Sequence, residues 1–208
     1  MRPTIGIDFD NTIVSYDDLI HRAAVDRGLV DVGIEPSKRA LRDRIRELAD
    51  GEVEWQKLQA VIYGPLMRDA RLIDGAADFV RCCRDAGVPV FVVSHKTEYA
   101  NYDVTQTNLR TEAFGWMAAQ GFFDPRGLAL DRSNVYFEST RDQKISRIRS
   151  IGCTHFIDDL EEVFLEPSFP PDVQKILYAP DAGDVSGSGA IVMPSWQAVR
   201  DYFFAHRA

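Results

Sequence analysis

Short apolar runs, separated by longer stretches with helical periodicity, constrain the fold of this chain more than any other feature. The runs cover residues 5–9, 88–93, 134–137, 155–157 and 176–178, and they are rich in β-branched and aromatic residues. Strands that alternate with helices pair in parallel, because each helix carries the chain back across the sheet. The pattern therefore predicts an α/β fold with a Rossmann-like, three-layer parallel sheet.

The stretch after the first strand interrupts this alternation, because it has the pattern of helices only. Ser37 begins one of these helices and Gly64 ends another. Loops at the carboxyl ends of parallel strands are where α/β sheets bind ligands, so we interpret the insertion as a small helical cap. An excursion that only stabilises the fold is the alternative. The predicted domains are a core of residues 1–14 and 71–208 and a cap of residues 15–70.

Charge and composition exclude several classes of partner. The chain has 208 residues, enough for one sizeable core, and a formal net charge of -8. Nucleic acids and anionic membranes are held by clustered Lys and Arg, so we expect neither as a partner. A small anionic substrate stays possible, because a divalent cation can reverse the local field. The Gly- and Ser-rich segment 182–190 lacks the lysine of a P-loop, and we expect a surface loop there.

The cysteines and the chain start favour a cytoplasmic protein. Cys82, Cys83 and Cys153 lack the spacing of a metal site, and we expect reduced thiols. The chain start runs into the first strand without a signal region, and no window approaches the length of a membrane span. Trp196 and Val199, at helical spacing, predict a helix that packs on the sheet. The pattern does not determine the oligomeric state.

Polar side chains follow the predicted strands where each strand ends. They are Asp8 and Asp10 after the first, Ser94, His95 and Lys96 at the second, Lys144 after the third, and Asp158 and Asp159 after the fourth. Each one alone is typical of a helix cap, a turn or a solvated helix face. Parallel strands, however, would gather all of them at one sheet edge. Residues i and i+2 of a flat strand face the same way, so Asp8 and Asp10 should converge while Phe9 enters the core.

These segments resemble the four ordered motifs of the haloacid dehalogenase superfamily. The matching motifs are DFDNT at residues 8–12, Ser94 after VPVFVV, Lys144, and IDD at residues 157–159. The resemblance covers residues 1–14 and about 71–180. Most members of this superfamily are magnesium-dependent phosphatases. Four motifs in order form a far more specific signal than a lone DxDxT.

The resemblance implies a catalytic role for four residues. Asp8 would be the nucleophile that forms an aspartyl-phosphate, and Asp10 would protonate the leaving oxygen and later take a proton from water. The Ser94 hydroxyl and Lys144 would orient and neutralise the oxygens of the transferring phosphoryl group.

The resemblance also implies a magnesium ion, since carboxylates facing a phosphate dianion repel it. The ion would bind the side chain of Asp8, the main-chain carbonyl of Asp10, and the side chains of Asp158 and Asp159. Hard oxygen ligands of this kind suit Mg²⁺.

Three further residues are predicted to contact the substrate. Asn11 stands where many relatives have Gly, and His95 and Lys96 directly follow the second motif. Lys96 could add positive charge against the phosphate or a second anionic group. Alternatively, Lys96 pairs with a carboxylate of the cap and His95 binds a backbone group.

The predicted function is therefore that of a magnesium-dependent phosphomonoester hydrolase acting on a small phosphorylated metabolite. Haloacid dehalogenases of the superfamily generally lack a carboxylate at the position of Asp10, so its presence favours phosphate esters. A phosphotransferase is one alternative. A phospho-ligand binding or regulatory module without turnover is another, although such a module has no use for a nucleophile and an acid together.

Overall fold

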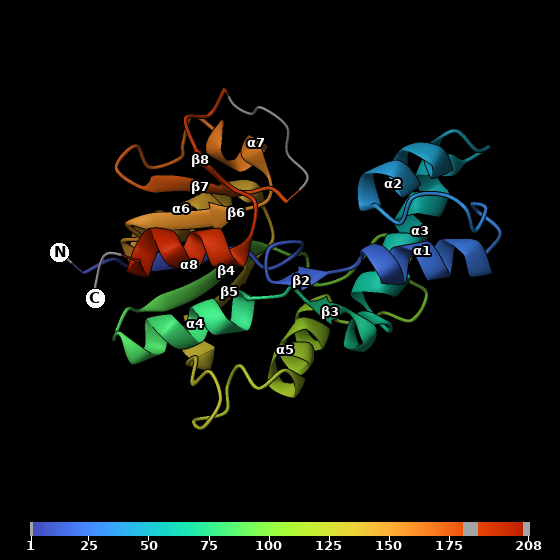
Figure 1. Cartoon of the computed structure of the whole chain (residues 1–208). Coiled ribbons are helices and arrows are strands. Elements are labelled where there is room, and N and C mark those ends of the chain that lie inside the picture. Colours follow the sequence, from blue (N-terminus) through green and yellow to red (C-terminus); the bar gives the residue numbers. More distant parts are fainter. Residues whose placement is uncertain (1, 181–186, 206–208) are drawn as a thin grey trace. The chain divides into compact units, whose positions relative to one another are not determined.

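A parallel sheet of six strands forms the centre of the larger part of the chain (Figure 1). The structure is a computed structural model that describes residues 2–180 and 187–205, so residues 182–186 of the predicted surface loop lie outside it. The strand order is β5-β4-β1-β6-β7-β8, and every neighbouring pair is parallel. The strands are β1 (Ile5–Ile7), β4 (Val90–His95), β5 (Val135–Glu138), β6 (His155–Asp158), β7 (Gln174–Tyr178) and β8 (Ile191–Met193).

Helices connect the strands as the sequence pattern predicts. They are α1 (Asp17–Asp26), α2 (Lys38–Arg46), α3 (Gly51–Tyr63), α4 (Ala76–Asp85), α5 (Leu109–Ala119), α6 (Arg141–Ile151), α7 (Glu161–Phe164) and α8 (Trp196–Phe204), with short 3₁₀ helices at Met67–Asp69 and Arg132–Asn134. No helix within residues 2–180 and 187–205 has both the length and the apolar character needed to cross a bilayer.

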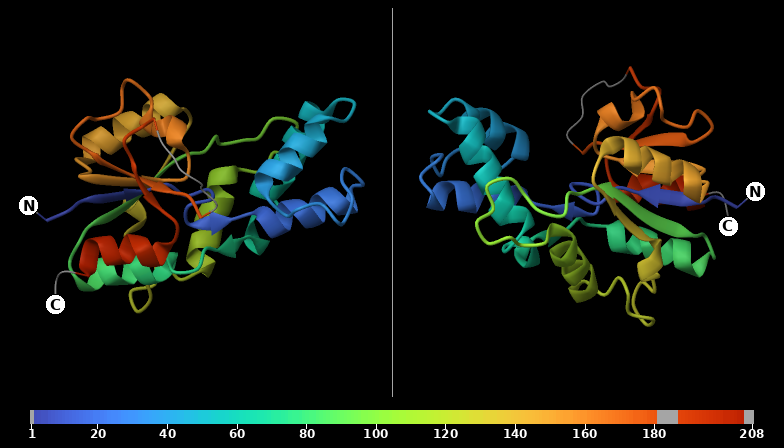
Figure 2. Two further views of the ribbon diagram at one scale, coloured as in Figure 1. Left: turned by 45° about the horizontal axis from the view of Figure 1, so that its top comes forward. Right: turned by 180° about the vertical axis from the view of Figure 1, so that it is seen from behind.

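The sheet is covered by helices on both faces, which confirms the predicted three-layer α/β fold. On one face, α6 and α7 bury Ile148 and Phe164 against Phe156 of β6. On the other, α4 and α8 pack side by side, with the ring centroids of Phe79 and Trp196 5.2 Å apart. The rear view in Figure 2 brings α6 to the front of the sheet. The predicted packing of the C-terminal helix is thereby confirmed, because Trp196 is buried in this layer.

Gly6 allows β1 to lie in the middle of this sheet. It pairs in register with Phe91 of β4 and Phe156 of β6. A Cβ atom on residue 6 would lie 2.5 Å from Cδ2 of Phe156, closer than two carbon atoms can approach. The apolar layer under α6 therefore depends on a residue without a side chain in β1.

The chain forms two compact units. The first contains residues 1–14, 72–96 and 120–208, and the second contains residues 15–71 and 97–119. Residues 97–119, which the sequence prediction counted with the core, thus belong to the unit that contains the predicted cap. The chain passes from one unit to the other within β2 (Val14–Ser15) and β3 (Arg71–Leu72), which pair as a small separate sheet, and again after residues 96 and 119.

The second unit is helical and has its own core. The predicted start of α2 is confirmed, since the hydroxyl oxygen of Ser37 accepts a hydrogen bond from the backbone N–H of Ala40 at 3.2 Å. The indole N–H of Trp116 in α5 donates to the carbonyl of Ala70 at 2.9 Å, and both residues are buried. This bond links the segment 97–119 to the segment that follows the first strand.

Candidate active site

The chain leaves the sheet earlier than predicted, and this turn determines how the first motif is displayed. β1 ends at Ile7, whereas the sequence predicted a strand through Phe9. The backbone N–H groups of Ile13 and Val14 both donate to the carbonyl of Phe9, at 2.9 and 3.1 Å, so the chain folds back on itself. Asn11 has a φ of 59°, in the left-handed region. Asn tolerates this conformation better than most residues, so residue 11 suits the turn.

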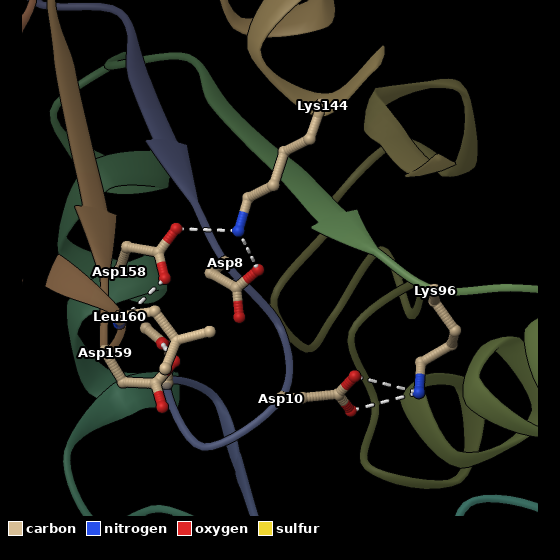
Figure 3. Close-up of polar contacts among 8 residues, drawn as sticks. Asp8, Asp10, Lys96, Lys144, Asp158, Asp159 and Leu160 are labelled. Atoms are coloured by element: carbon tan, nitrogen blue, oxygen red, sulfur yellow. Dashed lines mark hydrogen bonds and ion pairs between the residues drawn. The ribbon is translucent and has the colours of Figure 1, made fainter. Parts of the chain in front are cut away.

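Lys144 joins the first and fourth motifs in the interior of the protein (Figure 3). Its Nζ atom lies 2.6 Å from Oδ1 of Asp8 and 2.6 Å from Oδ2 of Asp158. All three side chains are buried, with at most 6% of their surface exposed. Buried ions are stable in proteins only when they are paired, so the lysine and the two aspartates depend on one another.

Asp10 binds a different lysine from the one that binds Asp8. The Nζ atom of Lys96 lies 3.0 Å from both Oδ1 and Oδ2 of Asp10. Figure 3 shows the two carboxylates turned toward different ammonium groups. The premise of a flat strand through Phe9 is wrong, because β1 ends at Ile7, and the convergence of Asp8 and Asp10 on one substrate stays a prediction. Phe9, as predicted, is fully buried.

Asp8, Asp158 and Asp159 form a cluster that could hold a metal ion. One carboxylate oxygen from each lies within 4.8 Å of the others. The backbone N–H of Leu160 donates to Oδ1 of Asp158 at 3.1 Å, and the hydroxyl of Thr12 donates to Oδ1 of Asp159 at 3.4 Å. These bonds orient Asp158, the last residue of β6, and Asp159, which follows it. A set of carboxylate oxygens without nitrogen or sulfur ligands fits Mg²⁺.

Burial dominates the electrostatics of this cluster. It raises the pKa of Asp8 to about 7; the Lys144 ammonium acts in the opposite direction, and the Asp158 and Asp10 carboxylates raise the pKa further. Burial by itself would lower the pKa of Lys144, but the attraction of Asp158 and Asp8 outweighs it and raises that pKa above the usual value. The acidic groups outnumber the ammonium groups here, so a cation would relieve the remaining repulsion.

Ser94 and His95 end the neighbouring strand. Ser94 is 1% exposed and pairs in register with Phe137 of β5. His95 is exposed, and its Nε2 atom lies 3.0 Å from the carbonyl oxygen of Ser139, so Nε2 carries the proton and donates. Burial lowers the pKa of His95, which favours the neutral imidazole near pH 7. The alternative in which His95 binds a backbone group is confirmed.

Two contacts of the site were not anticipated. Thr12, the last residue of the first motif, is fully buried and its hydroxyl donates to Asp159. Lys96 was expected to bind a substrate or a carboxylate of the cap, but it pairs with Asp10 of the first motif. The motif itself was the available signal for Thr12, and the burial of Lys96 has no signature in the sequence.

Searches against known proteins give matches in structure only. No protein-family model matches the sequence, and no curated protein matches it either. A solved haloacid dehalogenase family hydrolase from Deinococcus radiodurans, with bound phosphate and sodium, is 17% identical, with a TM-score of 0.58 and coverage of 97% of this chain and 94% of that chain.

Two other solved structures show the same relationship. The putative hydrolase YfnB from Bacillus subtilis, bound to magnesium, is 13% identical, with a TM-score of 0.53 and coverage of 98% of this chain and 99% of that one. The L-2-haloacid dehalogenase RSc1362 is 12% identical, with a TM-score of 0.58 and coverage of 97% and 98%. At these identities the likeness establishes the fold: the chain has the fold of haloacid dehalogenase superfamily hydrolases.

Proposed function

We propose that this chain, which has the fold of the haloacid dehalogenase superfamily hydrolases, is a magnesium-dependent phosphomonoester hydrolase of a small phosphorylated metabolite. The observation that carries the proposal is the buried contact of Lys144 with both Asp8 and Asp158, beside Asp159. These residues come from three separate parts of the chain. A cluster of buried charges is expensive to maintain, and perturbed acids of this kind are concentrated at catalytic sites.

In the proposed reaction, Asp8 is the nucleophile. One of its carboxylate oxygens forms a bond to phosphorus as the bond from phosphorus to the ester oxygen breaks, and Asp10 gives its proton to that oxygen. The alcohol leaves and an aspartyl-phosphate remains. A water molecule then attacks phosphorus, Asp10 takes the proton of the water, and the bond to Asp8 breaks to release inorganic phosphate. Lys144 and Ser94 would neutralise and orient the phosphoryl oxygens.

The side chains of Asp8, Asp158 and Asp159 and the main-chain carbonyl of Asp10 would hold the magnesium ion. When bound, Mg²⁺ supplies positive charge that offsets the repulsion between the carboxylates and the phosphate. The set of oxygen ligands described above supports this choice of metal.

The experiment is a panel of phosphate esters, with 2-haloacids included, assayed with Mg²⁺ and with a chelator. We expect hydrolysis of one or more small phosphate esters, loss of activity in the chelator, and loss of activity in Asp8→Asn. Asp78→Asn is the matched control, because Asp78 is an exposed acid of α4 paired with Arg81. Release of halide without phosphate hydrolysis would replace the proposal with a dehalogenase. Binding of beryllium fluoride without any turnover would favour the binding module.

A further inference from the structure

Lys96 is a buried lysine with an unusual partner. Only 3% of its side chain is exposed, and its Nζ atom lies 3.0 Å from both carboxylate oxygens of Asp10, which is 86 residues away in the sequence. Lysine is rarely this buried, because its ammonium group loses hydration and its long side chain loses conformational freedom. The pair is thus a costly arrangement at the end of β4.

The backbone and the ring beneath Lys96 fix its position. The N–H of Lys96 donates to the carbonyl of Glu138 at 2.8 Å, which continues the pairing of β4 with β5 by one residue. The ammonium group lies 5.6 Å from the centre of the Phe9 ring, a favourable distance for a cation over an aromatic face. The backbone bond to β5 and the contact with the Phe9 ring restrict the position of the Lys96 ammonium group. The ammonium group in turn restricts the position of the Asp10 carboxylate.

Asp10 lies in the turn after β1 and is less buried than Asp8. Asp10 lies beyond the last residue of the strand, and 21% of its side chain is exposed, compared with 6% for Asp8. An ammonium group that contacts both oxygens of a carboxylate restricts how that carboxylate can turn, and each carboxylate oxygen carries two lone pairs. Lys96 can therefore restrict the orientation of Asp10 while it occupies at most one lone pair on each oxygen.

We propose that Lys96 is a positioning residue that holds Asp10 for proton transfer, and this inference rests on the proposed function. This role differs from the predicted substrate contact of Lys96, because its ammonium group contacts both carboxylate oxygens of Asp10. Misplacement of a reacting group by about 1 Å costs roughly 100-fold in rate. Loss of Lys96 should therefore affect those reactions in which the leaving group needs a proton.

The test compares two esters in each variant. p-Nitrophenyl phosphate releases a weakly basic oxygen that needs little protonation, whereas an alkyl phosphate releases a strongly basic one. In Lys96→Met we expect kcat for the best alkyl phosphate of the panel to fall by about 10- to 100-fold, with p-nitrophenyl phosphate changed by less than about threefold and KM nearly constant. Lys175→Met is the matched control: the ammonium group of Lys175 binds the carbonyls of Phe164 and Ser188 and lies over the Phe169 ring.

Restoring the ammonium group separates positioning from folding. Lys96→Cys, alkylated with 2-bromoethylamine, carries an ammonium group at nearly the original distance, and it should regain most of the activity on the alkyl phosphate; wild type treated in the same way corrects for Cys82. An equal fall for both esters, a change confined to KM, or a failure of the alkylated protein to recover would overturn the positioning role. If wild type hydrolyses neither ester, nor any other phosphate ester of the panel, the proposed function itself fails and this inference with it.

Discussion

Replacing Lys144 with Met should expose the energetic cost of the buried cluster. The ammonium group lies 2.6 Å from an oxygen of Asp8 and 2.6 Å from an oxygen of Asp158, and the two carboxylates are 6% and 0% exposed. Met has a similar volume but no charge, so the change leaves two buried carboxylates without their shared cation. Breaking a buried pair by removal of one partner costs about 3–5 kcal/mol.

The cost should depend on pH and on the metal. Burial already raises the pKa of Asp8 to about 7, and loss of Lys144 raises it further. A carboxyl whose pKa is raised in the folded state contributes stability below its unfolded pKa and loses it as the pH rises. The destabilisation by Lys144→Met should therefore be small in acid and grow as the pH rises through about 7. Mg²⁺ should reduce it, because a bound cation stabilises the folded state.

The assay is thermal and urea unfolding of both proteins in chelator and in Mg²⁺, across this pH range. For a chain of this size, a loss of about 3–5 kcal/mol lowers Tm by roughly 6–20 °C. Arg141→Met is the matched control on the same helix, since the bond from Arg141 to Glu166 is 2.7 Å long but its side chains are 42% and 29% exposed. Such a surface pair contributes less than about 1 kcal/mol. Equal stability of the two variants in chelator at neutral pH would refute the reasoning.

Two further predictions concern the core. Gly6→Ala places a Cβ atom 2.5 Å from the Phe156 ring and should destabilise the protein by about 1–3 kcal/mol in urea unfolding, and a neutral result would contradict the packing described under α6. Burial raises the pKa of Cys83 and of Cys153 to about 12. Iodoacetamide near pH 8 should therefore label only the half-buried Cys82 in the native protein, and it should label all three cysteines in urea. Mass spectrometry that finds equal native labelling at the three thiols would contradict the burial.

The control for Gly6→Ala is a glycine with room for a methyl group. Gly115 lies within α5, and a Cβ atom there meets no atom within 4 Å. Gly115→Ala should stabilise its helix by up to about 1 kcal/mol. A destabilising result at both positions would point to a cause other than the crowding beneath α6.

The central part of the fold was predictable because its signals are local. Each apolar run marks a strand, and parallel pairing follows from the helices between the runs. β8 is three residues long and has too few residues for a pattern, while α5 follows a polar segment that masks its start. The assignment of residues 97–119 to the second unit depends on contacts such as that of Trp116 with Ala70, which no local pattern encodes.

The sequence predicts which residues form the candidate site better than it predicts which of them contact one another. The order of the motifs brought Asp8, Lys144 and Asp158 together, because the ends of parallel strands meet at one edge. The pairing of Lys96 with Asp10 was not foreseen. It arises from the turn after Ile7, which is closed by hydrogen bonds to the carbonyl of Phe9 rather than by the regular alternation of a strand.

The covalent state of Asp8 during turnover tests the account most directly. Wild type would be mixed with its best phosphate ester and Mg²⁺, quenched with sodium borohydride, digested, and examined by mass spectrometry. An aspartyl-phosphate is reduced to homoserine, so the account predicts homoserine at position 8, only with substrate and only when Mg²⁺ is present. Steady hydrolysis of the ester with residue 8 unmodified, or with the label on another residue, would contradict it.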